Sequence, residues 1–189
     1  MNPQRRLLLA TATQLSAAAT LFQAGTALAQ AGGASLPSSA ATEAKAPPLP
    51  APGTLLPLPE VPLLDGTVFR PDQAEGQVLV IYWWASTCPF CAQQSPEIQK
   101  LWLSQRDKGP RRLQLLTLSI DRTREEALAY LQKKGYTFPT GFVTPAIQRV
   151  LPKPKGLPIT LVRGRDGKLL QSEKGQMFPE DVELLTRWV

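Results

Sequence analysis

The chain has 189 residues, 43% of them hydrophobic, which suits one globular domain with extensions. Its formal net charge is +6, and two of the positive charges, Arg5 and Arg6, fall in a predicted export signal, so +4 remains without them. This mild excess gives no case for nucleic-acid binding, which needs a concentrated basic face. The chain has no histidine, which excludes Ser-His and Cys-His catalysis and histidine ligation of zinc or copper.

Residues 1–29 have the pattern of an export signal. Arg5 and Arg6 precede a stretch rich in Leu and Ala, and the small residues Ala27 and Ala29 form a cleavage site. We expect cleavage after Ala29, by either the general or the twin-arginine export route. A retained membrane anchor is the alternative, although two glutamines and a serine within the stretch disfavour it.

The next segment, residues 30–60, is rich in Ala, Pro, Ser and Gly and shows neither a helical nor a strand period. Its composition offers little to bury, so we expect a disordered, semi-extended linker. The predicted organisation is therefore a signal peptide at 1–29, a Pro/Ala-rich linker at 30–60 and a folded domain at 61–189.

The folded domain alternates strand and helix patterns along its whole length. Apolar runs indicate strands, and apolar stripes at helical spacing, preceded by capping residues, indicate helices. In chain order the expected elements are a hairpin over 63–69 turned at Asp65-Gly66, a buried strand over 78–84, a helix starting after Cys88, a strand over 113–120, a helix from Thr123 to Gly135, a hairpin of strands 159–163 and 168–171, and a helix from Pro179 to about Trp188. This order predicts an α/β fold in which helices flank a central mixed β-sheet.

Both cysteines of the chain lie in one C-x-x-C motif, Cys88-Pro89-Phe90-Cys91. Thiol–disulfide exchange needs a thiolate that attacks and a second thiol that resolves the mixed disulfide. The motif follows a buried strand and opens a helix, where free N–H groups and the helix dipole stabilise a negative charge on the first sulfur. In an exported protein without other cysteines, this context indicates a redox-active pair.

Two other roles of the cysteine pair stay open. A zinc site is disfavoured, because zinc takes about four ligands and the chain supplies two cysteines and no histidine. A purely structural disulfide is the second alternative, although a loop closed by so few residues removes little entropy from the unfolded chain. We expect neither a metal nor a cofactor.

A second motif, Gly156-Leu157-Pro158-Ile159-Thr160, leads into a predicted strand. A proline is allowed at the start of a strand, and on these residues alone the bond before Pro158 can be cis or trans. Trp84, directly before the loop that carries Cys88, belongs either to the core or to a surface near the motif. The basic residues before Pro158 could attract an acidic partner, but isolated charges favour a solvated basic face. These residues are Arg149, Lys153 and Lys155.

The segments 82–91, 95–97 and 156–162 resemble the TlpA/ResA branch of the thioredoxin superfamily, and the resemblance covers about residues 61–189. It implies a thioredoxin-like fold and periplasmic thiol chemistry, often disulfide reduction tied to cytochrome c maturation.

The resemblance also implies roles for single residues. Cys88 would attack, Cys91 would resolve, and Pro158 would be a cis-proline facing the disulfide. Leu157 would offer its backbone to a substrate strand, as in β-augmentation. The remaining expected substrate-binding residues are Trp84 and Phe90.

The chain departs from these relatives around the cysteine pair. Tyr82 stands where thioredoxins carry a buried acid, Gln94 where ResA-like proteins carry a glutamate, and Thr87 where an aromatic residue is usual. The dipeptide Pro89-Phe90 is closer to the DsbA oxidants, but their histidine is missing. The proton-transfer groups known in relatives are therefore absent, which leaves the direction of electron flow open.

We expect a periplasmic oxidoreductase that acts on protein thiols and disulfides, mainly as a reductase, with a DsbD-like membrane thiol–disulfide protein as electron donor. The reason for this direction is that Pro89-Phe90 offers no hydrogen-bond donor or positive charge to a thiolate on Cys88. We expect no nucleic-acid partner. The alternatives are a DsbA-like disulfide donor, a thiol peroxidase, and a non-catalytic binding module with a structural disulfide.

Overall fold

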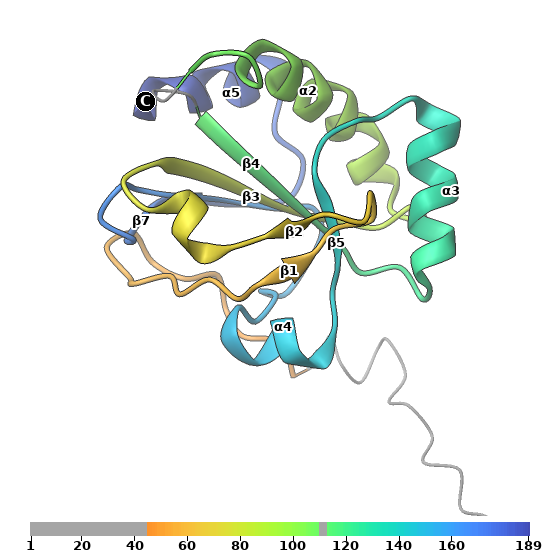
Figure 1. Ribbon diagram of the computed structural model, residues 1–189, viewed down its shortest axis with the longest axis horizontal. Coiled ribbons are helices and arrows are strands. Elements are labelled where there is room, and N and C mark those ends of the chain that lie inside the picture. Colours follow the sequence, from red (N-terminus) through yellow and green to blue (C-terminus); the bar gives the residue numbers. More distant parts are fainter. Residues whose placement is uncertain (1–44, 110–112) are drawn as a thin grey trace, which may run out of the picture. The chain divides into compact units, whose positions relative to one another are not determined.

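The computed structural model describes residues 45–109 and 113–189. The predicted signal peptide and the first part of the predicted linker lie outside these ranges. Figure 1 shows helices packed around a central sheet whose strand order is β5-β4-β3-β6-β7. The strands are β3 (Val78–Trp84), β4 (Leu113–Ser119), β5 (Thr140–Phe142), β6 (Ile159–Arg163) and β7 (Leu169–Lys174). β3 pairs in parallel with β4 and antiparallel with β6, which confirms the predicted mixed sheet.

The other elements cover this sheet. A small hairpin, β1 (Val61–Pro62) and β2 (Val68–Phe69), precedes it. The helices are α2 (Pro89–Gln105), α3 (Arg124–Lys134), α4 (Pro145–Val150) and α5 (Pro179–Glu183), with 3-10 turns at η1 (Pro71–Ala74) and η2 (Leu184–Trp188). In the part of the chain that the structure describes, no helix combines the length and the apolar character needed to cross a membrane.

Strand β3 separates two hydrophobic cores, because successive side chains of a strand point to opposite faces. Val80, Tyr82 and Trp84 face one core together with residues of α2, α3 and α5. The side chains between them face the other core, with the hairpin, α4 and the segment before β1. Every residue of β3 is buried, as predicted from its continuous apolar sequence, so the strand is a fixed base for the loop that follows it.

The structure contains elements that the sequence analysis missed or misplaced. Strand β5 and helix α4 were not predicted, because three residues and six residues are too short to show a period. A usable signal was Thr144-Pro145, since Thr144 caps α4 and Pro145 opens it. The C-terminal helix was predicted as one piece to about Trp188, but it changes to a 3-10 turn after Glu183.

The predicted free linker is wrong for residues 47–58, which pack on the domain. The Gly53 N–H donates to the carbonyl of Leu169 (2.7 Å), and the Leu56 N–H donates to the carbonyl of Gly167 (2.9 Å). Arg163 Nε donates to the Leu56 carbonyl (3.0 Å), and the Leu56 side chain is only 7% exposed. The leucines spaced among the prolines supply the apolar surface that a free linker would lack. The segment also covers one end of the edge strand β7, which protects its backbone from other chains.

This packing predicts a contrast between two neighbouring leucines. Leu56→Ala should lower the free energy of unfolding by about 2–5 kcal/mol, because it opens a cavity in a core. Leu55→Ala, at a side chain that is 66% exposed, should change it by less than about 0.5 kcal/mol. Urea unfolding of the two variants measures both values. Equal effects would show that residues 47–58 are not part of the folded domain.

Candidate active site

Cys88 lies at the junction between strand β3 and helix α2. A turn closed by the Cys88 N–H and the Ala85 carbonyl (3.1 Å) connects the two elements. Cys88 is the N-cap of α2, its Sγ accepts the N–H of Cys91 (3.1 Å), and Pro89 occupies the first turn. The predicted helix start after Cys88 is therefore confirmed. The first sulfur sits where unpaired N–H groups and the helix dipole favour a negative charge.

The two cysteines differ in exposure and are joined by a disulfide bond. Cys88 is half-buried, whereas Cys91, one turn further into α2, is only 1% exposed. Phe90, between them in sequence, is 55% exposed. Cys88 is thus the cysteine of the pair that another molecule can approach, and the exposed ring of Phe90 follows it two residues later in sequence.

Tyr82 lies beneath the cysteine pair and is fully buried. Its hydroxyl donates to the Cys91 carbonyl (3.4 Å) and shares a hydrogen bond with Ser95 Oγ (3.1 Å). Burial raises the pKa of Tyr82 far above its ordinary value. The residue at the position of the thioredoxin acid is therefore a neutral hydroxyl that anchors the first turns of α2 and cannot act as a base near neutral pH.

Gln94 joins three parts of the site through its buried amide. Nε2 donates to Thr160 Oγ1 on β6 (3.0 Å), and Oε1 accepts the Met177 N–H from the loop before α5 (2.9 Å). The side chain has no exposed surface. This amide links the helix that carries the cysteines to the strand that follows Pro158. It is uncharged and cannot take up or release a proton as a carboxyl group does.

Asp121 holds the short loop that leads to Cys88. Its Oδ1 accepts both the N–H (2.9 Å) and the hydroxyl (2.7 Å) of Ser86, and its Oδ2 accepts the hydroxyl of Ser119 (2.8 Å). The residue is 9% exposed. Asp121 was not predicted as a site residue from the sequence, although a carboxylate directly after a predicted buried strand was a usable signal.

The second motif lies at the start of β6. The bond between Leu157 and Pro158 is cis, as the resemblance implied, and Pro158 is buried. Ile159 pairs with Trp83 across the antiparallel β3–β6 ladder, so Pro158 follows the same register towards the end of β3. Leu157 is half-buried and packs against both cores. Its N–H and carbonyl form no hydrogen bond with any residue the structure describes.

Two expectations about nearby side chains need correction. Trp84 was expected at the substrate-binding surface, but it has no exposed area and instead packs in the core that contains Cys91. Its Nε1 donates to Thr117 Oγ1 (3.3 Å), and its ring lies 5.4 Å from that of Tyr130. Lys153 was expected on a solvated face, but it is only 6% exposed. For Trp84, contacts with residues distant in sequence decide the burial, whereas the hydrogen bonds of Lys153 are to its own loop.

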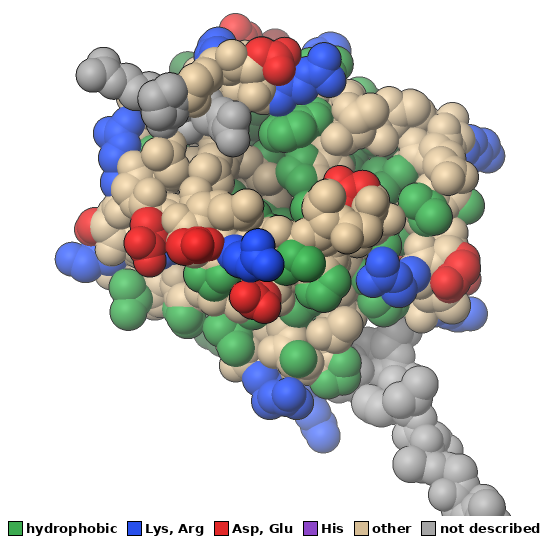
Figure 2. All heavy atoms as spheres, viewed as in Figure 1, with side chains coloured by type: hydrophobic (Ala, Val, Ile, Leu, Met, Phe, Trp, Pro, Cys, Tyr) green, Lys and Arg blue, Asp and Glu red, His purple; other side chains and the backbone are tan. Residues whose placement is uncertain are grey.

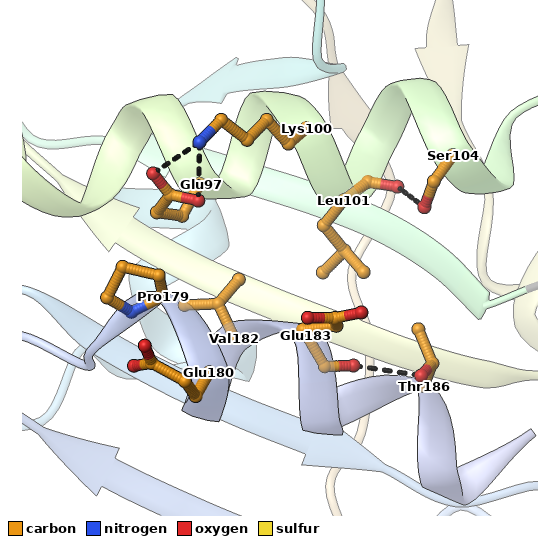
Figure 3. Close-up of a pocket in the computed structure, with 9 residues that line it drawn as sticks. All are labelled: Glu97, Lys100, Leu101, Ser104, Pro179, Glu180, Val182, Glu183 and Thr186. Carbon is orange, nitrogen blue, oxygen red and sulfur yellow. Dashed lines mark hydrogen bonds and ion pairs between the residues drawn. The ribbon is translucent and has the colours of Figure 1, made fainter.

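A cavity of about 390 Å³ lies between α2 and α5, away from the cysteines. Figure 3 shows that Leu101 and Val182 face each other across it, with the ion pair of Glu97 and Lys100 on the α2 side. Neither cysteine lines this cavity. Within the described ranges, no three Cys, Asp or Glu side chains gather as metal ligands. On the face shown in Figure 2, basic and acidic side chains are interspersed.

Comparisons with known proteins agree with this geometry. Residues 52–142 match the AhpC/TSA family, and no curated protein matches the chain. A candidate thiol:disulfide interchange protein DsbE from Chlorobium tepidum is 25% identical with a TM-score of 0.61, covering 73% of this chain and 94% of that one.

Two further solved structures share the fold at lower identity. A thioredoxin-family thiol:disulfide interchange protein from Chlorobium tepidum is 17% identical with a TM-score of 0.64, covering 73% of this chain and 97% of that one. A secreted thiol–disulfide isomerase from Corynebacterium glutamicum is 19% identical with a TM-score of 0.61, covering 69% and 82%. Residues 52–142 therefore resemble the AhpC/TSA family, and the chain has the thioredoxin fold with the vicinal cysteine pair of a thiol–disulfide oxidoreductase.

Proposed function

We propose that this protein is an exported oxidoreductase that reduces disulfides in protein clients, with Cys88 as the attacking and Cys91 as the resolving thiol. The observation that supports this most directly is the asymmetry of the pair: Cys88 is accessible at the N-terminus of α2, and Cys91 is buried one turn later. A thiolate at a helix N-terminus is stabilised, and a buried thiol is protected until the mixed disulfide brings its target close.

The exchange proceeds in two displacements. The Cys88 thiolate attacks one sulfur of a client disulfide, the client S–S bond breaks, and the second client sulfur leaves as a thiolate that takes up a proton. Cys91 then gives up its proton and attacks Cys88 Sγ. This closes the Cys88–Cys91 disulfide and releases the first client sulfur, which is also protonated. The client gains two electrons and two protons, and the protein is left oxidised.

In this proposal the client binds to the surface around Cys88, which includes Leu157, Pro158 and Phe90. The main-chain groups of Leu157 are open for pairing with an extended client segment, in the manner of β-augmentation. Pro158 stands against the disulfide in this proposal, because its register places it near the end of β3. Phe90 offers 55% of its surface to apolar client side chains.

The reductase direction rests on what surrounds Cys88. DsbA is strongly oxidising because its reduced form is stabilised, with a first thiol of pKa about 3.5. Here Pro89 and Phe90 present no donor or charge to the Cys88 thiolate, and the helix N-terminus contributes only about 0.3–1 kcal/mol at an exposed site. The pair should therefore be more reducing than that of DsbA.

The N-terminal sequence and the relatives support the proposed location and pathway. Residues 1–29 have the pattern of an export signal, and one structural neighbour is described as secreted. In a periplasm that is kept oxidising, a reductase needs electrons from a membrane thiol–disulfide protein of the DsbD type. Cytochrome c maturation is the pathway that the TlpA/ResA resemblance suggests.

The family match also keeps a thiol peroxidase in view as a second candidate. Peroxidases of this fold have a Thr-x-x-Cys at the helix start, whereas position 85 is a buried alanine in this chain. Hydrogen peroxide consumption by the reduced protein separates the two activities, and we expect none above the buffer rate.

Insulin reduction tests the main proposal. With dithiothreitol as electron donor, the wild-type protein should accelerate insulin reduction. The Cys88→Ser variant should fall to the rate of dithiothreitol alone, because no attacking thiol remains. The Cys91→Ser variant should lose turnover yet accumulate mixed disulfides through Cys88. Full activity in the Cys88→Ser variant would contradict the assignment and favour a binding module.

Alkylation distinguishes the two thiols directly. In a brief reaction of the reduced protein with iodoacetamide, Cys88 should be labelled at least about tenfold faster than Cys91, the ratio given by one pKa unit between two thiols. Peptide mapping by mass spectrometry measures the ratio, and denatured protein, in which both thiols react alike, is the control. Preferential labelling of Cys91 would reverse the assigned roles.

The direction of electron flow is tested by equilibration with glutathione buffers. The mature domain should have a reduction potential well below the value of about −120 mV known for DsbA, because its Cys88 thiolate has less stabilisation. A potential close to the DsbA value would make the protein a disulfide donor.

A further inference from the structure

The loop between α4 and β6, residues 151–158, carries the expected client-binding backbone and has no regular structure. Three of its eight residues are prolines, at positions 152, 154 and 158, and a proline has no N–H. The loop therefore has fewer N–H groups than carbonyls, and main-chain hydrogen bonds within it cannot pair every carbonyl. Donors from elsewhere can hold the remaining carbonyls.

Lys153 supplies these donors from inside the loop. Its Nζ donates to the carbonyl of Pro154 (2.7 Å) and to the carbonyl of Gly156 (3.0 Å). Lysine is almost never this deeply buried unless its ammonium is hydrogen-bonded or paired, and an ammonium group has three donors to offer. The residues between α4 and Leu157 are thus folded around one buried cation.

The rest of the loop is fixed at its two sides. The Lys155 N–H donates to the Pro47 carbonyl (2.9 Å), and the Gly175 N–H donates to the Pro158 carbonyl (2.9 Å). Gly156 has a φ of +104°, and a Cβ there would collide with the side chain of Lys174. Between these supports, Lys153 binds the carbonyls of Pro154 and of Gly156, the residue directly before Leu157.

We infer that Lys153 is a positioning residue for client binding: it holds the Pro154 and Gly156 carbonyls and so presents the Leu157 backbone to an extended client segment. This inference rests on the proposed function only in taking Leu157 as the client-pairing residue. Replacing the ammonium by an apolar group removes its hydrogen bonds to the buried Pro154 carbonyl and the partly buried Gly156 carbonyl, so the loop should rearrange. A small disulfide needs no backbone pairing and should still react normally at Cys88.

The test compares two thiol reagents in a Cys91→Ser background. One is a cysteine-containing peptide activated as its 2-thiopyridyl mixed disulfide, and the other is 2,2′-dithiodipyridine. In both reactions Cys88 forms a new disulfide and 2-thiopyridone leaves, so its absorbance reports both rates. Lys153→Met should lower the ratio of the peptide rate to the small-reagent rate by about tenfold, the effect of losing one charge-assisted hydrogen bond. The rate with 2,2′-dithiodipyridine should stay within about twofold of the parent's rate. This is well below the roughly tenfold change that a shift of one unit in the pKa of the thiol would cause.

The control is Lys155→Met, which removes the same charge from an exposed neighbour in the same loop and should leave the ratio unchanged. Lys153→Arg keeps the charge and donors and should restore part of the ratio. If Lys153→Met does not fold, as judged by circular dichroism, Lys153→Gln is the second variant, with the same split expected. The inference is overturned if Lys153→Met leaves the rate ratio unchanged or lowers both rates equally. It is also overturned if Lys155→Met lowers the ratio as much, or if the parent protein shows no preference for the peptide. Failure to reduce insulin with the split intact would contradict only the reductase role.

Discussion

The redox site depends on the complete burial of β3, which fixes the position of everything attached to it. Because β4 runs parallel to β3, their carboxyl ends meet at one edge of the sheet and bring Asp121 to the loop before Cys88. Because β6 runs antiparallel, its first residues reach the same edge. Strand directions alone therefore assemble Cys88 and Leu157, which are far apart in sequence, at one place. Substitutions that disturb the packing of β3 should affect all three parts together.

Beneath the cysteines, the polar groups anchor the structure and do not exchange protons. The hydroxyl of Tyr82 is held by Ser95 and the Cys91 carbonyl, and burial keeps it neutral. Gln94 is an amide with both of its ends hydrogen-bonded. Under the proposed roles, neither side chain can take up the proton that Cys91 gives up, so this proton has to pass to solvent or to another base.

The mixed sheet flanked by helices and the vicinal cysteine pair could be predicted from the sequence, because local patterns indicate them. The helix after Cys88 and the capped helix at Thr123 follow from short-range patterns, and the structure contains both. The features that escaped prediction depend on partners distant in sequence. Residues 47–58 become ordered by contacts with β7, and Trp84 is covered by α3. A proline-rich sequence such as residues 47–58 is predicted to be a linker, because the surface that its leucines cover cannot be identified from the sequence.

The two loops at the site are held by side chains of opposite charge, because one loop presents hydrogen-bond donors and the other presents acceptors. The loop before Cys88 presents donors, the N–H and hydroxyl of Ser86, and the carboxylate of Asp121 accepts both. The loop before Pro158 is poor in N–H groups and presents carbonyls, which the ammonium of Lys153 binds. Neither loop has a strand ladder or a helix to hold it. Burying a charge is unfavourable unless several hydrogen bonds compensate it. A buried charged side chain that holds a loop is therefore expected where the loop must keep one conformation. Disulfide exchange has that requirement, because the attacking sulfur and the client disulfide must be aligned before the bond can transfer.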